Sequence, residues 1–324
     1  MKVLVVLMLA CFLCTSCTAL PAEERAFVVA LCVEKTDEWQ IYGRIPTYQS
    51  GGGYRTVKGS GATVEEALLD MENETPMRIN LSQTRILAAE AELAGSGELS
   101  VLLSALEKRR DMRMQCAVLL TESASAAADA LQPMAGARLS KTIELMLKAR
   151  IEQGVILPST LADVIRMGER QTPVLPAMLI TGDTIAIAGG YTEDGLLLPP
   201  EEVQLLSMLL ESTHQLQLVL PGGYASVRDV SAKVRLSDDL TTARVQLTLT
   251  ETEASLSGEN LRKELAEALL KLLTKLSAAG CDALGLGRQA VMRCIDMAQW
   301  RAMNWPEKYR SIRWEIAVGV NEST

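Results

Sequence analysis

The fold is set most clearly by residues 241–280, which read TTARVQLTLTETEASLSGENLRKELAEALLKLLTKLSAAG. Over positions 245–249, valine and leucine alternate with polar residues, which is the period of a strand with one buried face. From Leu261 to Leu276, leucines recur every three or four positions, which is the period of an amphipathic helix. The glycine that follows is a typical C-cap. This stretch therefore predicts a strand followed by a long helix that packs on a sheet.

Further strands are predicted on both sides of this stretch. Residues 215–220 and 233–236 have an extended pattern, and the chain closes on a cleanly alternating strand from Ile312 to Val320. A shorter helix is predicted around 288–300. Strands with one polar face are typical of antiparallel sheets that face water on one side. The second half of the chain therefore indicates an α+β arrangement.

The first half alternates strands with helices. It opens with a predicted hairpin over 26–33 and 39–45, in which Gln40, Tyr42 and Arg44 form the polar face. A capping box, Thr63 to Glu66, begins the first helix. Further strands are predicted at 54–58, 83–89 and 113–120, and further helices at 96–109, 123–131, 139–153 and 160–169. This order predicts a mixed layered fold.

Two prolines, Pro173 and Pro176, interrupt the helical pattern and favour a domain boundary nearby. We therefore expect an α+β protein of two to three domains, in which mixed or antiparallel sheets are flanked by helices. Its predicted parts are a leader over 1–16, an N-terminal domain over 17–175, a middle segment of a hairpin and a helix over 176–215, and a C-terminal domain over 216–324 with an antiparallel sheet and a long helix.

The amino terminus has the pattern of an export signal. Lys2 precedes an apolar run from Val3 to Leu13, which is too short to cross a bilayer core of roughly 30 Å. The residues Leu13-Cys14-Thr15-Ser16-Cys17 resemble a bacterial lipobox, with Cys17 as the cysteine to be acylated. Several acyl chains on one cysteine give durable membrane anchoring, whereas a single chain binds reversibly.

The composition excludes some functions of the mature chain. A net charge of −8 and a pI near 5 argue against binding of nucleic acid, since no basic stripe is available to phosphates. After Cys17 no stretch approaches 18 apolar residues. The remaining cysteines, Cys32, Cys116, Cys281 and Cys294, are interpreted as buried free thiols, with a Cys32–Cys116 or Cys281–Cys294 disulfide as the alternative.

The residues that could carry chemistry are few. His214 is the one histidine, which excludes His-rich zinc sites. The run Gly285-Leu286-Gly287 matches a loose dinucleotide pattern, but a helix precedes it where that motif needs a strand, so a backbone turn is the preferred interpretation. Asp282 with Arg288 is interpreted as an ion pair between domains, with a ligand clamp as the alternative. We assign no catalytic, cofactor-binding or metal-binding residue.

Three tryptophans lie near the end of the chain, at positions 300, 305 and 314. They are expected to pack the last helix on the last strand, with a hydrogen-bond partner for each indole. An exposed aromatic contact surface is the alternative.

The landmarks, taken in order, resemble the Ger(x)C family, the lipoprotein C subunits of bacterial spore germinant receptors. They are the strand at 23–31, the glycine-led helix start at 59–67, the hairpin Gly182 to Ile187 with the helix cap at 200–202, the Asp-x-x-Gly-x-Gly run at 282–287, and the stretch from Trp300 to Trp305. Two features depart from the family: Thr18-Ala19 stands where Trp-Asp is usual, and the tail lacks the usual basic and glycine residues.

The resemblance implies a lipid-anchored subunit without catalytic activity and without a cofactor. It would assemble with two integral-membrane receptor subunits, of the A and B types, and support nutrient-triggered germination from the outer face of the spore inner membrane. The alternative functions are an exported solute-binding protein or another envelope lipoprotein. A hydrolase would need a base, for which His214 is the one histidine available.

Overall fold

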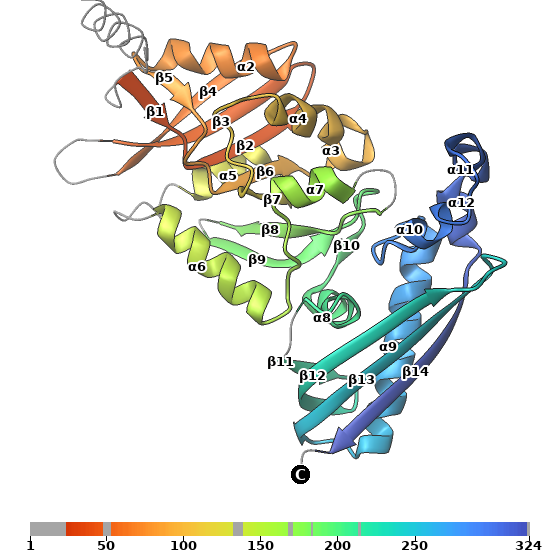
Figure 1. Ribbon diagram of the computed structural model, residues 1–324. Coiled ribbons are helices and arrows are strands. Elements are labelled where there is room, and N and C mark those ends of the chain that lie inside the picture. Colours follow the sequence, from red (N-terminus) through yellow and green to blue (C-terminus); the bar gives the residue numbers. More distant parts are fainter. Residues whose placement is uncertain are drawn as a thin grey trace, which may run out of the picture.

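The computed structural model describes residues 24–47, 53–131, 139–167, 171–182, 184–212 and 215–322. These residues form an eight-stranded sheet in the first part of the chain, a four-stranded sheet in the last part, and a two-stranded pair (Figure 1). Helices flank both large sheets, and both contain parallel and antiparallel neighbours. The predicted α+β class with mixed sheets is confirmed.

The eight-stranded sheet has parallel strands at its centre and antiparallel hairpins at both edges. In spatial order its strands are β10 (Leu197–Leu198), β9 (Thr184–Tyr191), β8 (Leu175–Thr181), β7 (Ala117–Thr121), β6 (Ile86–Glu90), β2 (Ala30–Lys35), β3 (Trp39–Pro46) and β4 (Tyr54–Gly61). The pairs β2–β6, β6–β7 and β7–β8 are parallel. Beside this sheet, β1 (Arg25–Phe27) pairs with β5 (Arg78–Asn80).

The sheet continues across the position where the prolines suggested a boundary. Strand β8 pairs with β7, with Leu120 opposite Ala177, and then forms a hairpin with β9. Pro176 sits at an irregularity in the β8–β9 register, which is where a strand can accept a residue without an N–H donor. The prolines therefore end the helical pattern but do not end the sheet.

Helices cover both faces of this sheet (Figure 1). One face packs against α2 (Val64–Asp70), α3 (Glu92–Gly95), α4 (Glu98–Glu107) and α7 (Leu161–Met167), with η2 (Met71–Glu74) following α2. The other face packs against α5 (Ala124–Ala130) and α6 (Leu139–Glu152). The predicted capping box is confirmed, since the Thr63 side chain accepts from the Glu66 N–H and the Glu66 side chain accepts in return.

The prediction that β3 has a polar, wet face is wrong at Arg44. Its side chain is fully buried, because α5 covers that face of the sheet. The guanidinium donates to Thr56 Oγ1 at 2.6 Å and to the Tyr54 carbonyl at 3.3 Å. Burial lowers the pKa of Arg44 from its ordinary value. Alternation within the strand could not reveal the second layer of helices.

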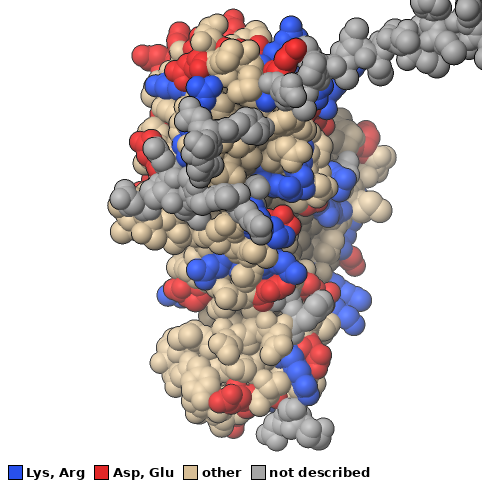
Figure 2. Space-filling view, turned by 90° about the vertical axis from the view of Figure 1, so that its left-hand side faces the viewer, with Lys and Arg blue, Asp and Glu red and all other residues tan. Residues whose placement is uncertain are grey.

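The C-terminal domain is a four-stranded sheet with helices on one face. Its strands are β11 (Gln215–Leu220), β12 (Gly223–Leu236), β13 (Thr242–Ala254) and β14 (Arg313–Glu322), and its core packs against α8 (Pro200–Leu209) and α9 (Gly258–Ala279). Strand β14 runs parallel to β13, so the expected all-antiparallel sheet is mixed. Viewed from the left-hand side of Figure 1, the lower part of this domain shows few charged side chains (Figure 2).

The segment between α9 and β14 holds three short helices in place of the single helix predicted around 288–300. They are α10 (Leu286–Val291), α11 (Met297–Met303) and α12 (Trp305–Arg310). The extended Asp296 breaks the pattern, because it accepts from the Gln299 N–H and starts a new helix as an N-cap. Across the described ranges, no helix combines the length and apolar character needed to cross a bilayer.

Candidate functional site

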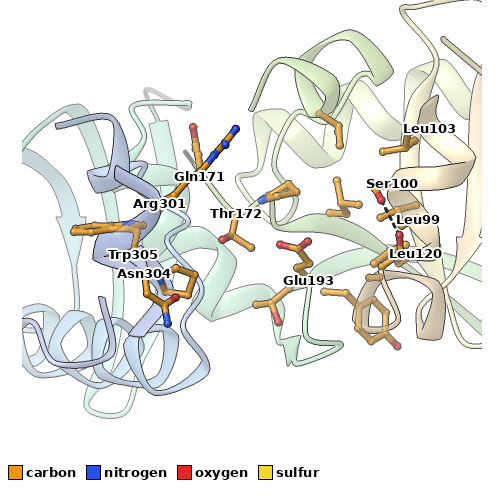
Figure 3. Close-up of a pocket in the computed structure, with 18 of the residues that line it drawn as sticks. Leu99, Ser100, Leu103, Leu120, Gln171, Thr172, Glu193, Arg301, Asn304 and Trp305 are labelled. Atoms are coloured by element: carbon orange, nitrogen blue, oxygen red, sulfur yellow. Dashed lines mark hydrogen bonds between the residues drawn. The ribbon is translucent and has the colours of Figure 1, made fainter. Parts of the chain in front are cut away.

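A cleft of about 710 Å³ lies between the eight-stranded sheet with its helices and the short helices α11 and α12 (Figure 3). Residues from both domains line it. They come from α3, α4, α7, β7, β8, β9, the loop after β9 and the segment before β8 in the first domain, and from α11 and α12 in the second. The cleft is therefore a product of domain packing.

One wall of the cleft is apolar. Leu99 and Leu103 come from α4, and Leu120 comes from the end of β7 (Figure 3). Leu175 and Tyr191 from β8 and β9 continue this wall. All five side chains are buried, so they belong to the core and present one edge of it to the cleft. This wall can bind an apolar group by excluding water.

The opposite wall combines polar and aromatic side chains and comes from the C-terminal helices. Arg301 lies on α11, Asn304 joins α11 to α12 in a left-handed conformation with φ of 47°, and Trp305 begins α12. Arg301 and Asn304 are exposed, whereas Trp305 is buried. This wall offers a guanidinium and a side-chain amide to a bound group.

The segment before β8 ties the two walls together. The Gln171 side-chain amide donates to the Ala283 carbonyl at 2.9 Å, and the Thr172 N–H donates to the Asp282 carbonyl at 3.1 Å. Gly285 packs against the Gln171 side chain with φ of 70°, a conformation that favours glycine. These contacts fix the turn after α9 against the first domain.

Asp282 is the buried polar centre of that turn. Its Oδ1 accepts from the Leu286 N–H at 2.9 Å, and its Oδ2 accepts from the Gly287 N–H at 2.6 Å and from Trp305 Nε1 at 2.9 Å. Burial raises the pKa of Asp282, and these donors act in the opposite direction. The carboxyl therefore joins the start of α10 to α12 and positions Trp305 in the cleft wall.

The rim of the cleft carries an acidic side chain. Glu193 follows β9 and is partly exposed, with its carboxyl in the middle of the cleft view (Figure 3). Burial of part of the side chain and the neighbouring Asp194 both raise its pKa. The cleft thus combines an apolar wall with one acidic and one basic group, an arrangement suited to binding an amphipathic partner.

The residues singled out from the sequence meet different outcomes. Cys17 and His214 lie outside the described residues. The interpretation of Asp282 and Arg288 as an ion pair is wrong, since the Asp282 carboxyl is taken by three N–H donors and Arg288 is exposed on α10. The interpretation of the Gly285 to Gly287 run as a backbone turn is confirmed at Gly285, which is the left-handed N-cap of α10, whereas Leu286 and Gly287 are the first residues of that helix.

The cysteines and tryptophans largely follow the sequence interpretation. Cys32, Cys116 and Cys281 are buried, Cys294 is half-buried, and all four are free. Trp305 donates to Asp282 and Trp314 donates to Ser277 Oγ at 2.8 Å. The rings form a chain with centroid separations near 6 Å, Trp300–Trp305–Tyr309–Trp314. The tryptophans therefore pack α12 against β14, as expected.

Sequence reasoning missed Gln171, Glu193 and Arg301 as residues of one site. They come from three segments that are distant in the chain, and only domain packing brings them to one cleft. Trp300 and Trp305, which the sequence singled out, were the one local indication of this cleft. In the described parts of the chain, no group of three His, Cys, Asp or Glu side chains could hold a metal ion.

One comparison with known proteins identifies a family, and another identifies a similar fold. Residues 19–180 match the family model described as the spore germination protein N-terminal domain. The crystal structure of the GerBC protein is similar over 91% of this chain and 97% of that chain, with a TM-score of 0.55 and 13% identity. Among curated proteins, no sequence matches. At this identity the structural likeness shows the fold alone.

Proposed function

This chain belongs to the Ger(x)C family, the C subunits of spore germinant receptors, and from that premise we propose that it is a lipid-anchored receptor subunit without catalytic activity. The observation that carries the proposal is the family match over residues 19–180, half of the 324-residue chain. Membership of the family implies association with the spore membrane and with other receptor subunits.

The proposed anchor is Cys17. It follows the apolar run from Val3 to Leu13 and the small residue Ser16, as expected for a processed and acylated cysteine. Several acyl chains on this residue would hold the chain at the outer face of the spore inner membrane, because each buried methylene contributes about 0.8 kcal/mol. At that position the chain would contact two membrane-spanning subunits, of the A and B types.

Replacing Cys17 tests the anchor. We expect Cys17→Ser to abolish incorporation of labelled palmitate, to release the chain from the spore membrane fraction and to slow nutrient-triggered germination. Cys14→Ser is the matched control, since it removes a neighbouring leader thiol and should leave all three readouts unchanged. Palmitate incorporation into the Cys17→Ser chain, or normal germination of spores that carry it, would contradict the proposal.

The cleft favours a second candidate, an exported lipoprotein that binds a small solute directly. In that case a solute with an anionic group should raise the thermal unfolding midpoint of the purified chain. Arg301→Ala should remove this shift, whereas Arg288→Ala, which changes an exposed arginine on α10, should retain it. If a broad screen of small nutrients gives no shift, this second candidate is ruled out and the receptor-subunit role stands alone.

A further inference from the structure

The segment between α10 and α11 exposes apolar side chains to an unusual degree. We call residues 291–298 the α10–α11 tip. Ile295 is 93% exposed and Met292 is 83% exposed, the two highest values for large hydrophobic residues in the described ranges, and Met297 is 45% exposed. Three such residues within six positions make the tip a candidate interaction surface.

The tip is held in this conformation by specific contacts. The Ile295 N–H donates to Gln299 Oε1 at 2.7 Å, and the Gln299 N–H donates to Asp296 Oδ1 at 2.8 Å. On one side Trp300 is buried and stacks on Trp305. Because the backbone next to Ile295 is fixed in this way, the outward position of its side chain is part of the fold.

The other side of the tip is anchored to the β12–β13 turn. Arg293 donates to the Leu236 carbonyl at 2.9 Å and to the Ser237 carbonyl at 2.7 Å, and it pairs with Asp238 at 3.2 Å. The tip is therefore braced at both ends, and its apolar side chains cannot fold back into the core without breaking these bonds.

The stretch that forms the tip is basic, and the turn beside it is acidic. Residues 288–301 carry Arg288, Arg293 and Arg301 against one acid, Asp296, whereas the β12–β13 turn contributes Asp238, which pairs with Arg293, and Asp239. Asp296 is engaged as the N-cap of α11, while Arg288 and Arg301 are exposed. Exposed apolar side chains flanked by two exposed arginines, Arg288 and Arg301, match a bilayer interface, where the apolar groups enter and the cations remain at the headgroups.

We infer that the α10–α11 tip is a second membrane contact, which inserts Met292, Ile295 and Met297 into an anionic lipid surface. The inference rests on the membrane location proposed above. In Figure 1 the tip region at α11 is the uppermost part of the C-terminal domain, and the carboxyl end of β14 points away from it. Strand β1 lies toward the same upper end of the view.

An environment-sensitive dye placed on the tip tests this contact. The chain from Thr18, which holds every described residue, is tethered by an amino-terminal polyhistidine tag to vesicles with a nickel-chelating lipid, so attachment does not depend on acylation of Cys17. The label is attached at Ile295→Cys in a Cys294→Ser background. The other thiols stay unlabelled, because Cys32, Cys116 and Cys281 are buried and burial raises their pKa values, that of Cys32 to about 12.

On vesicles that contain phosphatidylglycerol we expect a blue shift of the dye and quenching by brominated lipid chains, with a smaller response on phosphatidylcholine alone. Met292→Asp with Met297→Asp should lower the inserted fraction about tenfold or more, since burial of one such side chain is worth at least a factor of ten. A label at Val219→Cys is the matched control, because Val219 is 76% exposed on β11 in a different part of the fold. It should not respond.

Two results would overturn the inference: no response of the label at position 295 on anionic vesicles, or equal responses at positions 295 and 219. Both results are measured as dye responses of protein tethered through its polyhistidine tag, so they are independent of the palmitate labelling that tests Cys17. Unchanged thermal unfolding midpoints of the aspartate variants would confirm that a lost response comes from the tip and not from unfolding.

Discussion

Asp282→Ala is expected to lower the free energy of unfolding of the C-terminal domain by about 3–5 kcal/mol. The substitution leaves three buried donors, the N–H groups of Leu286 and Gly287 and the indole of Trp305, without an acceptor. Each unsatisfied buried donor costs about 1–3 kcal/mol. Because this carboxyl joins α10 to α12, its removal should also release the C-terminal helices that form one wall of the cleft.

Urea unfolding followed by tryptophan fluorescence measures this effect. Asp296→Ala is the matched control, since it removes another aspartate that caps a helix but lies at an exposed position. An exposed N-cap contributes typically about 1 kcal/mol. The loss in the free energy of unfolding for Asp282→Asn should lie between the losses for Asp282→Ala and Asp296→Ala, because the amide keeps one acceptor oxygen. Equal losses for Asp282→Ala and Asp296→Ala would show that the buried carboxyl has no special role.

Gly59→Ala is the second substitution for which we expect a large effect, a loss of about 3 kcal/mol or more. Gly59 lies on β4, directly under α2, and an added Cβ would lie 2.1 Å from the Ala67 carbonyl oxygen and 2.6 Å from the Met71 N–H nitrogen. Both clashing atoms belong to the backbone, so helix and strand would have to separate. Overpacking typically costs 1–3 kcal/mol, and a rigid backbone contact places this site at the upper end or above.

Gly95→Ala is the control for Gly59→Ala. The nearest atom to an added Cβ at Gly95 is 3.9 Å away, and Gly95 has no positive φ. This alanine should leave stability unchanged or raise it by about 0.4–1 kcal/mol, because it restricts the unfolded chain. Chemical denaturation of both variants gives the two free energies of unfolding to be compared. A Gly59→Ala chain as stable as the Gly95→Ala chain would contradict the close packing of α2 on β4.

The sequence located several local features of the site correctly and for physical reasons. Gly285 lies in a turn, as expected from the helix that precedes it, and Trp305 and Trp314 pack and find hydrogen-bond partners as expected. The interpretation of the sequence was wrong for Asp282, because its charge and the opposite charge of Arg288, six positions later, suggested an ion pair. The carboxyl instead accepts hydrogen bonds from N–H groups at the start of α10. Backbone N–H donors of this kind cannot be recognised from residue types.

The sequence by itself determined the elements whose signals are local: the alternation over 245–249, the leucine spacing from Leu261 to Leu276, and the capping box at Thr63. It also predicted the mixed α+β class. Only the tertiary structure decided that β8 extends the first sheet, that β14 runs parallel to β13, that Arg44 is buried, and that Glu193 and Arg301 meet at one cleft. Periodicity reports that a face is buried, but the element that buries it and the direction in which it runs depend on packing between distant segments.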